Sequence, residues 1–183
     1  MKVVVLGAGV VGVASAWYLM RAGHEVTVVE RGSAAALETS FANGGQISVS
    51  HAEPWANPGA PLQILRWLGR EDAPLLFRLR ADTAQWRWGL RFLFECLPSR
   101  ARRNTVGILR LALYSRTLLK ALRAATGIGY DHSERGILHV YTDRAQFEAA
   151  RKSAQLMNEL GGERLPQTPQ QMVALEPALA HAL

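Results

Sequence analysis

Residues 2–31 have the sequence KVVVLGAGVVGVASAWYLMRAGHEVTVVER. The β-branched run Val3–Leu6 predicts a buried parallel strand, and glycines with the spacing G-x-G-x-x-G follow it at positions 7, 9 and 12. The first glycine permits a tight turn, the second lets the backbone approach a pyrophosphate, and the third lets a helix pack closely on the strand. We therefore expect a strand, a glycine loop and a helix whose N-terminus faces phosphate groups.

The rest of this stretch predicts a complete βαβ unit. Four apolar residues have helical spacing and would form one face of the helix: Val13, Ala16, Trp17 and Met20. Gly23 would end the helix, and a second strand at Val26–Val29 leads into Glu30. An acid about 20 residues after the glycines commonly binds a ribose 2′-hydroxyl and disfavours a 2′-phosphate. The stretch thus predicts a dinucleotide-binding unit, with a βαβ unit that has no ligand as the alternative.

The composition is that of a globular protein, since 49% of the 183 residues are hydrophobic and 20% are charged. The net charge of +6 indicates a surface that attracts anions, such as a dinucleotide or acidic lipid headgroups. Cys96 has no second cysteine with which to form a disulfide. No stretch has the roughly 18 uncharged apolar residues of a membrane-spanning helix. We expect a cytoplasmic protein without a metal site, because no cluster of histidine, cysteine or carboxylate residues has metal-ligand spacing.

A second motif lies in the turn-rich segment 32–57, where residues 37–48 have the sequence LETSFANGGQIS. Small polar residues of this motif can bring backbone donors and short side chains close to a ligand: Ser40, Asn43, Gly44, Gly45 and Gln46. A surface loop with a glycine turn is the alternative when the segment is considered alone.

Further short segments follow these two motifs: PW at 54–55, PG at 58–59, LALYSRTLLKALRA at 111–124, RG at 135–136 and EPALA at 176–180. Together they resemble the small subunits of the bacterial D-amino-acid dehydrogenases, which belong to the flavoprotein superfamily of D-amino-acid oxidase, glycine oxidase and sarcosine oxidase. The resemblance covers nearly the whole chain, and the motif from Thr39 to Ser48 is more specific than the glycines.

The resemblance implies that the cofactor is FAD rather than NAD, which composition alone does not separate. On the family pattern the glycine loop would line the pyrophosphate: Gly7, Ala8, Gly9, Val10, Val11 and Gly12. Glu30 would hold the adenosine ribose, and Arg31 would lie beside the adenine. The residues of the second motif would run along the cofactor toward the flavin: Ser40, Asn43, Gly44, Gly45 and Gln46. Gln46 is the candidate for the position closest to the flavin.

The resemblance also implies an activity, the oxidation of a D-amino acid to an imine that water converts to a 2-oxo acid and ammonia. Hydride would pass from Cα to flavin N5, and the electrons would go on to a quinone-type acceptor in a membrane. No residue is assigned a catalytic role, because no nucleophile-plus-base motif is present. A truncated, catalytically inactive nucleotide-binding fragment and an NAD-dependent oxidoreductase remain alternatives.

The expected fold is α/β, or α+β overall, with a Rossmann-like FAD-binding βαβ unit followed by a helical, partly β segment. Residues 1–57 would be the N-terminal part of a discontinuous FAD-binding domain, and residues 58–183 a helical region and the start of a substrate-binding domain. Strands are also expected at Gln46–Val49 and, from its alternation, at Gly136–Thr142. Because a doubly wound sheet needs more parallel strands than these, we expect an incomplete fold that represents the N-terminal portion of such an enzyme. The alternative is that a second polypeptide or a homodimer completes the fold.

Residues 58–103 are expected to be helical and interleave arginines with aromatic residues. One face would contain Trp86, Leu90, Leu93 and Leu97. This pattern fits an amphipathic helix packed on the substrate domain, or an interfacial helix on anionic lipid at the inner face of the plasma membrane. Nucleic acid is the third interpretation, but no recognised module is present and no nucleic-acid partner is expected.

Three further helices are expected in the second half of the chain. The first covers Val106–Ala125 and is closed by Gly127. The second is capped by Asp143 and ends at Gly161-Gly162. A capping box at residues 168–171 opens the third, and Pro177 stops it.

Overall fold

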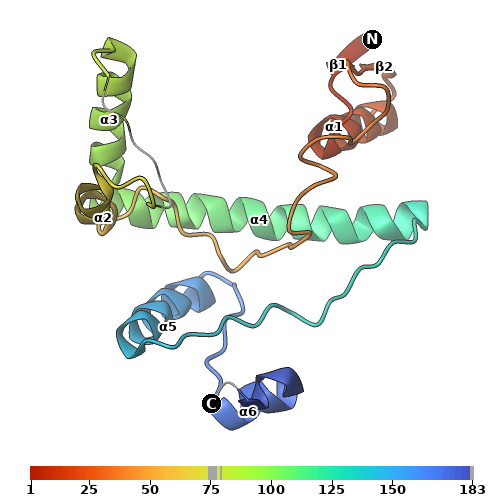
Figure 1. The fold of residues 1–183 in the computed structure, drawn as a ribbon. Coiled ribbons are helices and arrows are strands. Elements are labelled where there is room, and N and C mark those ends of the chain that lie inside the picture. The colour runs from red at the N-terminus through yellow and green to blue at the C-terminus, as the bar shows by residue number, and fades with distance from the viewer. Residues whose placement is uncertain (74–77, 79, 182–183) are drawn as a thin grey trace. The chain divides into compact units, whose positions relative to one another are not determined.

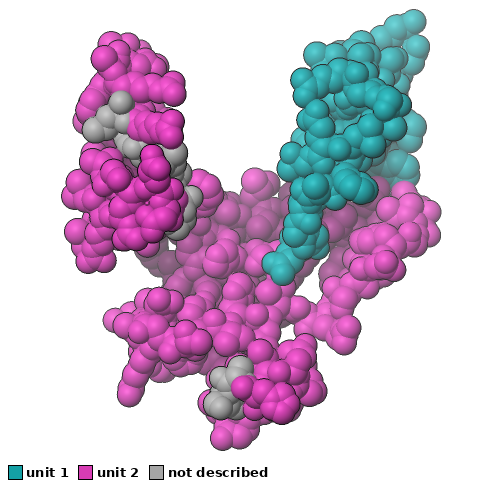
Figure 2. All heavy atoms as spheres, in the orientation of Figure 1, with its two compact units in different colours: residues 1–46 teal, residues 47–183 magenta. Residues whose placement is uncertain are grey.

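The computed structural model describes residues 1–73, 78 and 80–181 (Figure 1). The chain divides into two compact units, residues 1–46 and residues 47–183 (Figure 2). The boundary predicted after residue 57 is the limit of the first part of a discontinuous FAD-binding domain. The division into compact units does not test that limit, so it stays a prediction. The described chain is mixed α/β, with a parallel βαβ unit at its N-terminus and helices through most of the remainder.

Unit 1 is the βαβ unit. Strand β1 (Lys2–Leu6), helix α1 (Val10–Arg21) and strand β2 (Glu25–Val29) follow one another, and the two strands pair in parallel from Lys2↔Glu25 to Leu6↔Val29. Gly23, with φ of 85°, follows the C-cap and donates its N–H to the carbonyl of Met20 at 3.0 Å. The predicted strand, helix, glycine stop and strand are therefore confirmed.

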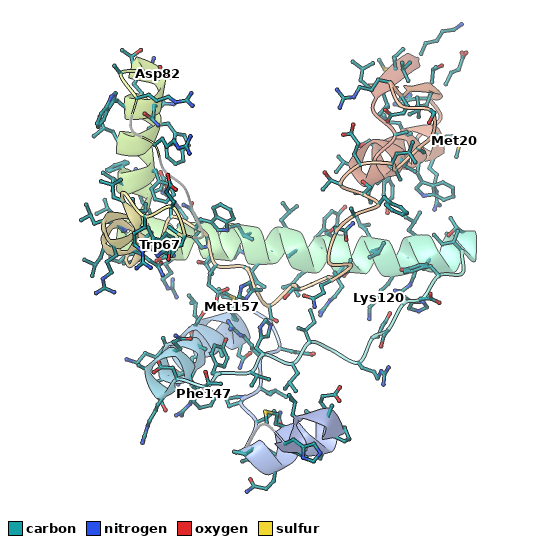
Figure 3. All side chains as sticks on the ribbon, in the orientation of Figure 1. Met20, Trp67, Asp82, Lys120, Phe147 and Met157 are labelled. Atoms are coloured by element: carbon teal, nitrogen blue, oxygen red, sulfur yellow. The ribbon has the colours of Figure 1, made fainter. Side chains whose placement is uncertain are left out.

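The predicted apolar face of α1 is partly wrong, because Val13 and Met20 (labelled in Figure 3) are exposed. At 100° per residue, the face of α1 that packs on the strands is centred on Gly12, Ala16 and Leu19. Gly12 lies closest to the sheet because it has no Cβ, and this sets the rotation of the helix. Val13 is rotated about 100° away from that contact.

The prediction that β1 is buried is also corrected. Val3 and Val5 are half-buried, whereas Val4 and Leu6 on the opposite face are 62% and 80% exposed. Side chains alternate across a strand, and in the described residues α1 is the helix that packs on these two strands. One face of the two-stranded sheet is therefore uncovered.

The regular secondary structure in the described residues of unit 2 is helical, and irregular segments connect the helices. Its helices are α2 (Ala60–Trp67), α3 (Thr83–Glu95), α4 (Pro98–Thr126), α5 (Arg144–Glu159), α6 (Pro169–Leu175) and the 3₁₀ helix η1 (Pro177–His181). The helix expected at Val106–Ala125 begins earlier, because Pro98 starts α4 and the basic run after it forms the first turns. Gly127, with φ of 63°, ends α4 as predicted.

The predicted caps of the last two α-helices are confirmed. The Asp143 carboxylate accepts from the Gln146 N–H at 2.8 Å and begins α5. Thr168 and Gln171 form the capping box of α6, with the Gln171 N–H donating to Thr168 Oγ1 at 3.2 Å and the Thr168 N–H donating to Gln171 Oε1 at 2.8 Å. Each of these signals is contained within four residues, so the local sequence specifies it.

The strands expected at Gln46–Val49 and Gly136–Thr142 are wrong. Within the described ranges 1–73, 78 and 80–181, β1 and β2 are the strands, and neither expected segment pairs with another. Alternating side chains give a segment two faces, but a strand also requires a partner for its backbone N–H and C=O groups. The described part of the second unit is thus not partly β.

The core of unit 2 joins the segment after Gln46 to two helices. Val49 and Ala52 pack with Leu109 of α4 and Met157 of α5 (labelled in Figure 3), and the side chains of Leu109 and Met157 are 0% exposed. The turn that follows the second motif is therefore held by apolar packing against α4 and α5.

Candidate dinucleotide-binding site

The glycine loop between β1 and α1 has a conformation that other residues do not fit. Gly7 has φ of 95°, a region that favours glycine, and donates its N–H to the Val29 carbonyl at 2.7 Å. A Cβ on Gly12 would lie 1.9 Å from the Gly7 carbonyl oxygen. The first and third glycines of the motif thus have the roles that their spacing predicts, a tight turn and a close approach of helix to strand.

The N-terminus of α1 is capped from a distant part of unit 1. Gly9 is the N-cap residue and has no side chain with which to cap the helix. The Val10 N–H donates instead to Ser40 Oγ at 2.9 Å. A Cβ on Gly9 would lie 3.2 Å from the same oxygen. Ser40 of the second motif therefore lies against the glycine loop, where the first N–H groups of the helix have no i−4 carbonyl.

The Glu30 carboxylate lies at the end of β2 and is bound to the glycine loop. Its Oε1 accepts from the Gly32 N–H at 2.9 Å, and its Oε2 accepts from the Ala8 N–H at 2.6 Å. The hydrogen bond from Gly32, followed by that from Ala8, holds the pKa of Glu30 below its ordinary value. The group is therefore an ionised acceptor with free lone pairs on both oxygens, which suits the hydroxyl donors of a ribose.

The loop after β2 folds back over the glycine loop. Ala36 has φ of 61°, unusual for a residue other than glycine, and its N–H donates to the Ala8 carbonyl at 3.1 Å. Arg31 donates from Nη2 to Glu38 Oε1 at 2.8 Å, and this hydrogen bond raises the pKa of Arg31. The parts played by Ala36 and Glu38 were not predicted, because they depend on how the loop returns rather than on a local pattern.

Asn43 organises its own turn in this structure. Its Nδ2 donates to the carbonyls of Thr39 and Ser40 at 3.0 and 3.1 Å, and its Oδ1 accepts from the Gly45 N–H at 2.7 Å. Gly44 and Gln46 are exposed, and the structure brings neither to the glycine loop. Of the second motif, Ser40 alone is bonded to the glycine loop in the described hydrogen bonds.

Other kinds of site are not found among the described residues. Residues 1–73, 78 and 80–181 contain no group of three or more histidine, cysteine, aspartate or glutamate residues that could hold a metal ion. In the same residues no helix has both the length and the apolar character needed to cross a bilayer.

Comparison with known proteins identifies the family. The family model described as "FAD dependent oxidoreductase" (DAO) matches residues 2–183. The chain belongs to this family. No solved structure matches the chain.

Its relatives include several proteins named D-amino acid dehydrogenase. The chain is 65% identical over 180 residues to that of Paramagnetospirillum magneticum, covering 98% of this chain and 43% of the relative. It is 62% identical to that of Dechloromonas aromatica and 46% identical to that of Agrobacterium fabrum, covering 100% of this chain and 44% of each relative. The chain thus spans less than half the length of these relatives.

The family's cofactor is FAD, and the residues of unit 1 fit its adenosine and pyrophosphate groups. The Glu30 carboxylate has acceptor capacity for a ribose hydroxyl, and the α1 N-terminus presents N–H groups to an anion. The glycines leave the backbone of the loop accessible at close range. Because the chain belongs to a family of FAD-dependent oxidoreductases, the alternative of an NAD-dependent oxidoreductase is disfavoured.

Proposed function

We propose that the chain forms the adenosine- and pyrophosphate-binding part of an FAD-dependent D-amino acid dehydrogenase, which converts D-amino acids to 2-oxo acids and ammonia. The observation that supports this most is the Glu30 carboxylate, held by the N–H groups of Ala8 and Gly32 beside the glycine loop. The proposed reaction rests on the names of the relatives. The proposed binding of the adenosine and pyrophosphate groups rests on the geometry of the glycine loop and Glu30.

In this proposal each element of unit 1 has one task. Residues 7–12 bind the pyrophosphate through backbone N–H groups and the α1 dipole. Glu30 accepts from the adenosine ribose, and Arg31 lies beside the adenine. Ser40 supports the N-terminus of α1, and residues 43–46 lead toward the flavin, with Gln46 closest to it.

Bound FAD supplies the two-electron oxidation of the amino acid at Cα. The part of the chain described here would orient the cofactor through its adenosine end. Because no described residue is assigned to the substrate carboxylate or to the reacting atoms, a nucleotide-binding fragment without activity is the second candidate.

The proposed domain organisation follows from the uncovered sheet. Val4 and Leu6 expose one face of β1, which in an FAD-binding domain of this family would be covered by further elements. Residues 1–57 would then be the first part of a discontinuous, Rossmann-like domain, and residues 58–183 the start of a substrate-binding domain.

A membrane surface is the proposed location of the electron acceptor. Residues 60–103 carry nine arginines and four carboxylates, and on α3 the side chains of Trp86 and Leu90 are 54% and 68% exposed. Glu95 accepts from Arg100 and Asn104 at 2.6 and 2.9 Å, which fixes the corner between α3 and α4. Exposed tryptophan and leucine among arginines suit the headgroup region of an anionic bilayer, from which a quinone could accept electrons.

Sedimentation with vesicles of phosphatidylglycerol and phosphatidylcholine tests this surface. The double variant W86S/L90S is expected to lose binding, whereas L111S/Y114S, which changes two exposed residues of α4, is expected to keep it. Equal sedimentation of both variants would contradict the assignment of the surface to α3.

The cofactor assignment is tested by Glu30→Gln, with Glu25→Gln at the other end of β2 as the matched control. Glutamine retains the size of the side chain but removes the charge, and its amide NH₂ cannot accept from a ribose hydroxyl. We expect FAD affinity to fall about tenfold or more in E30Q and to be unchanged in E25Q. Equal affinities in the two variants would contradict the role of Glu30.

The reaction is tested by the visible spectrum of the purified protein with FAD, before and after D-alanine is added without oxygen. Bleaching of the flavin bands supports the dehydrogenase. Bands that persist support the inactive nucleotide-binding fragment.

A further inference from the structure

A polar cluster in unit 2 lies outside the proposed cofactor site and joins three segments of the chain. Glu53 Oε1 accepts from Arg164 Nη1 at 2.7 Å and also from Ser153 Oγ of α5. Arg164 Nη2 donates to Tyr141 Oη at 3.3 Å, and the Arg164 side chain is only 14% exposed. The cluster therefore attaches the segment around Glu53 to α5 and to the residues that follow it.

The second oxygen of Glu53 has no such partner. Glu53 Oε2 is buried and makes no hydrogen bond within the described part of the chain. A buried acceptor without a donor is costly, and more so when it is charged. His51 Nδ1 lies 3.8 Å from this oxygen, too far for a hydrogen bond but within reach of a small side-chain movement. A protonated imidazole donates from both nitrogens, so a proton on His51 would supply the donor that Glu53 lacks.

A second histidine limits how many protons the cluster can take. The rings of His51 and His139 are stacked, with centroids 5.4 Å apart and an interplanar angle of 14°. Burial, followed by the positive charges of His51 and Arg164, lowers the pKa of His139, and Glu53 acts in the opposite direction. Two imidazolium ions beside Arg164 would place three positive charges around one carboxylate, so the second proton is disfavoured.

We propose that the stacked His51–His139 pair is a one-proton switch, in which a proton taken up by His51 bonds Glu53 Oε2 and tightens residues 49–53 on α4 and α5. The groups that face the pair are Glu53 on its own segment, Tyr141 beside His139, and Arg164 after α5. The segment that tightens contributes Val49 and Ala52 to the core of unit 2. The switch does not depend on the proposed cofactor.

The direction of the pH effect follows from the charges. When His51 takes up the first proton, a charge-assisted hydrogen bond to Glu53 is added and residues 49–53 are held more tightly on α4 and α5. At lower pH the second imidazole gains a proton, and the segment loosens. The pKa of Glu53 is lowered although burial acts against this, so its ion pair with Arg164 is lost only below the ordinary carboxyl range.

Hydrogen exchange of residues 49–53 in the purified chain, corrected for the intrinsic pH dependence of exchange, tests the switch. We expect protection to rise about five- to tenfold between pH 8 and pH 6 in the wild type, and not to rise in His51→Gln or Glu53→Gln. His132→Gln, which changes an exposed histidine of the same unit, is expected to retain the rise. His139→Gln is expected to keep the rise and to extend it below pH 6, because the second positive charge is gone.

Two results would overturn the proposal: the same rise in H51Q as in the wild type, or loss of the rise in H132Q. Circular dichroism checks that each variant is folded. If E53Q does not fold, H51Q and H132Q still decide the outcome, since both change exposed side chains. The measurement is made without FAD, so a failure of flavin binding leaves it unaffected.

Discussion

Gly12→Ala is expected to separate α1 from the strands of unit 1. The added Cβ would lie 1.9 Å from the Gly7 carbonyl oxygen, which is 1.5 Å short of the 3.4 Å at which ordinary contact begins. Gly7 cannot move to accommodate it, because its N–H is bonded to Val29 at 2.7 Å and its φ of 95° is fixed by the turn. The helix must therefore shift outward, and we expect a loss of about 2–3 kcal/mol, the upper part of the range for overpacked sites.

Hydrogen exchange of the β1 and β2 amides measures this loss in unit 1 separately from unit 2. A loss of about 2–3 kcal/mol corresponds to protection that falls by roughly 30- to 150-fold. Gly107→Ala is the matched control, because a Cβ at this position in α4 meets nothing within 4 Å. Alanine there is expected to stabilise the helix by about 0.5–1 kcal/mol. Unchanged protection of β1 in G12A would refute the inference that the third glycine is needed for close packing.

Three further substitutions test other parts of the structure. Ser40→Ala removes the cap on the Val10 N–H and is expected to cost about 0.5–1 kcal/mol, measured by hydrogen exchange in the first turn of α1; unchanged exchange would contradict the capping role. Leu109→Ala leaves a cavity at a fully buried position and is expected to cost about 2–5 kcal/mol in urea unfolding, so a loss well under 1 kcal/mol would contradict the packing of the unit 2 core. Hydrogen bonds from Lys120 and Arg123 lower the pKa of Glu134 to about 2. The stability that the ionised carboxylate contributes is therefore fully present above the ordinary carboxyl pKa and is lost as the pH falls toward 2. Glu134→Gln is expected to reduce the acid sensitivity of the residues 128–136 in that range, and an unchanged pH profile would count against the ion pair.

The features that sequence predicted correctly are those encoded within a few neighbouring residues. The glycine spacing specifies the turn and the packing of α1, and Asp143 and Thr168 begin their helices by accepting hydrogen bonds from residues three positions further on. These signals require no knowledge of the rest of the fold.

The features that sequence did not predict depend on contacts between distant residues. The bond from Val10 to Ser40 spans 30 positions, and that from Arg164 to Glu53 spans 111. The alternation in Gly136–Thr142 is compatible with a strand, but no described segment pairs with it, and a strand requires a partner. The predicted apolar face of α1 is misplaced for a different reason: the spacing of apolar residues does not show that the contact at Gly12 sets the rotation of the helix.

Titration of the purified chain with FAD and, separately, with FMN tests directly whether unit 1 binds the adenosine and pyrophosphate groups of the cofactor. The two cofactors share the flavin ring, but only FAD has the adenosine and pyrophosphate groups that the glycine loop and Glu30 are proposed to bind. Quenching of flavin fluorescence reports the binding of each. We expect saturable binding of FAD and at least about tenfold weaker binding of FMN. Equal affinity for the two cofactors, or no binding of FAD, would contradict the proposed role of the glycine loop and Glu30.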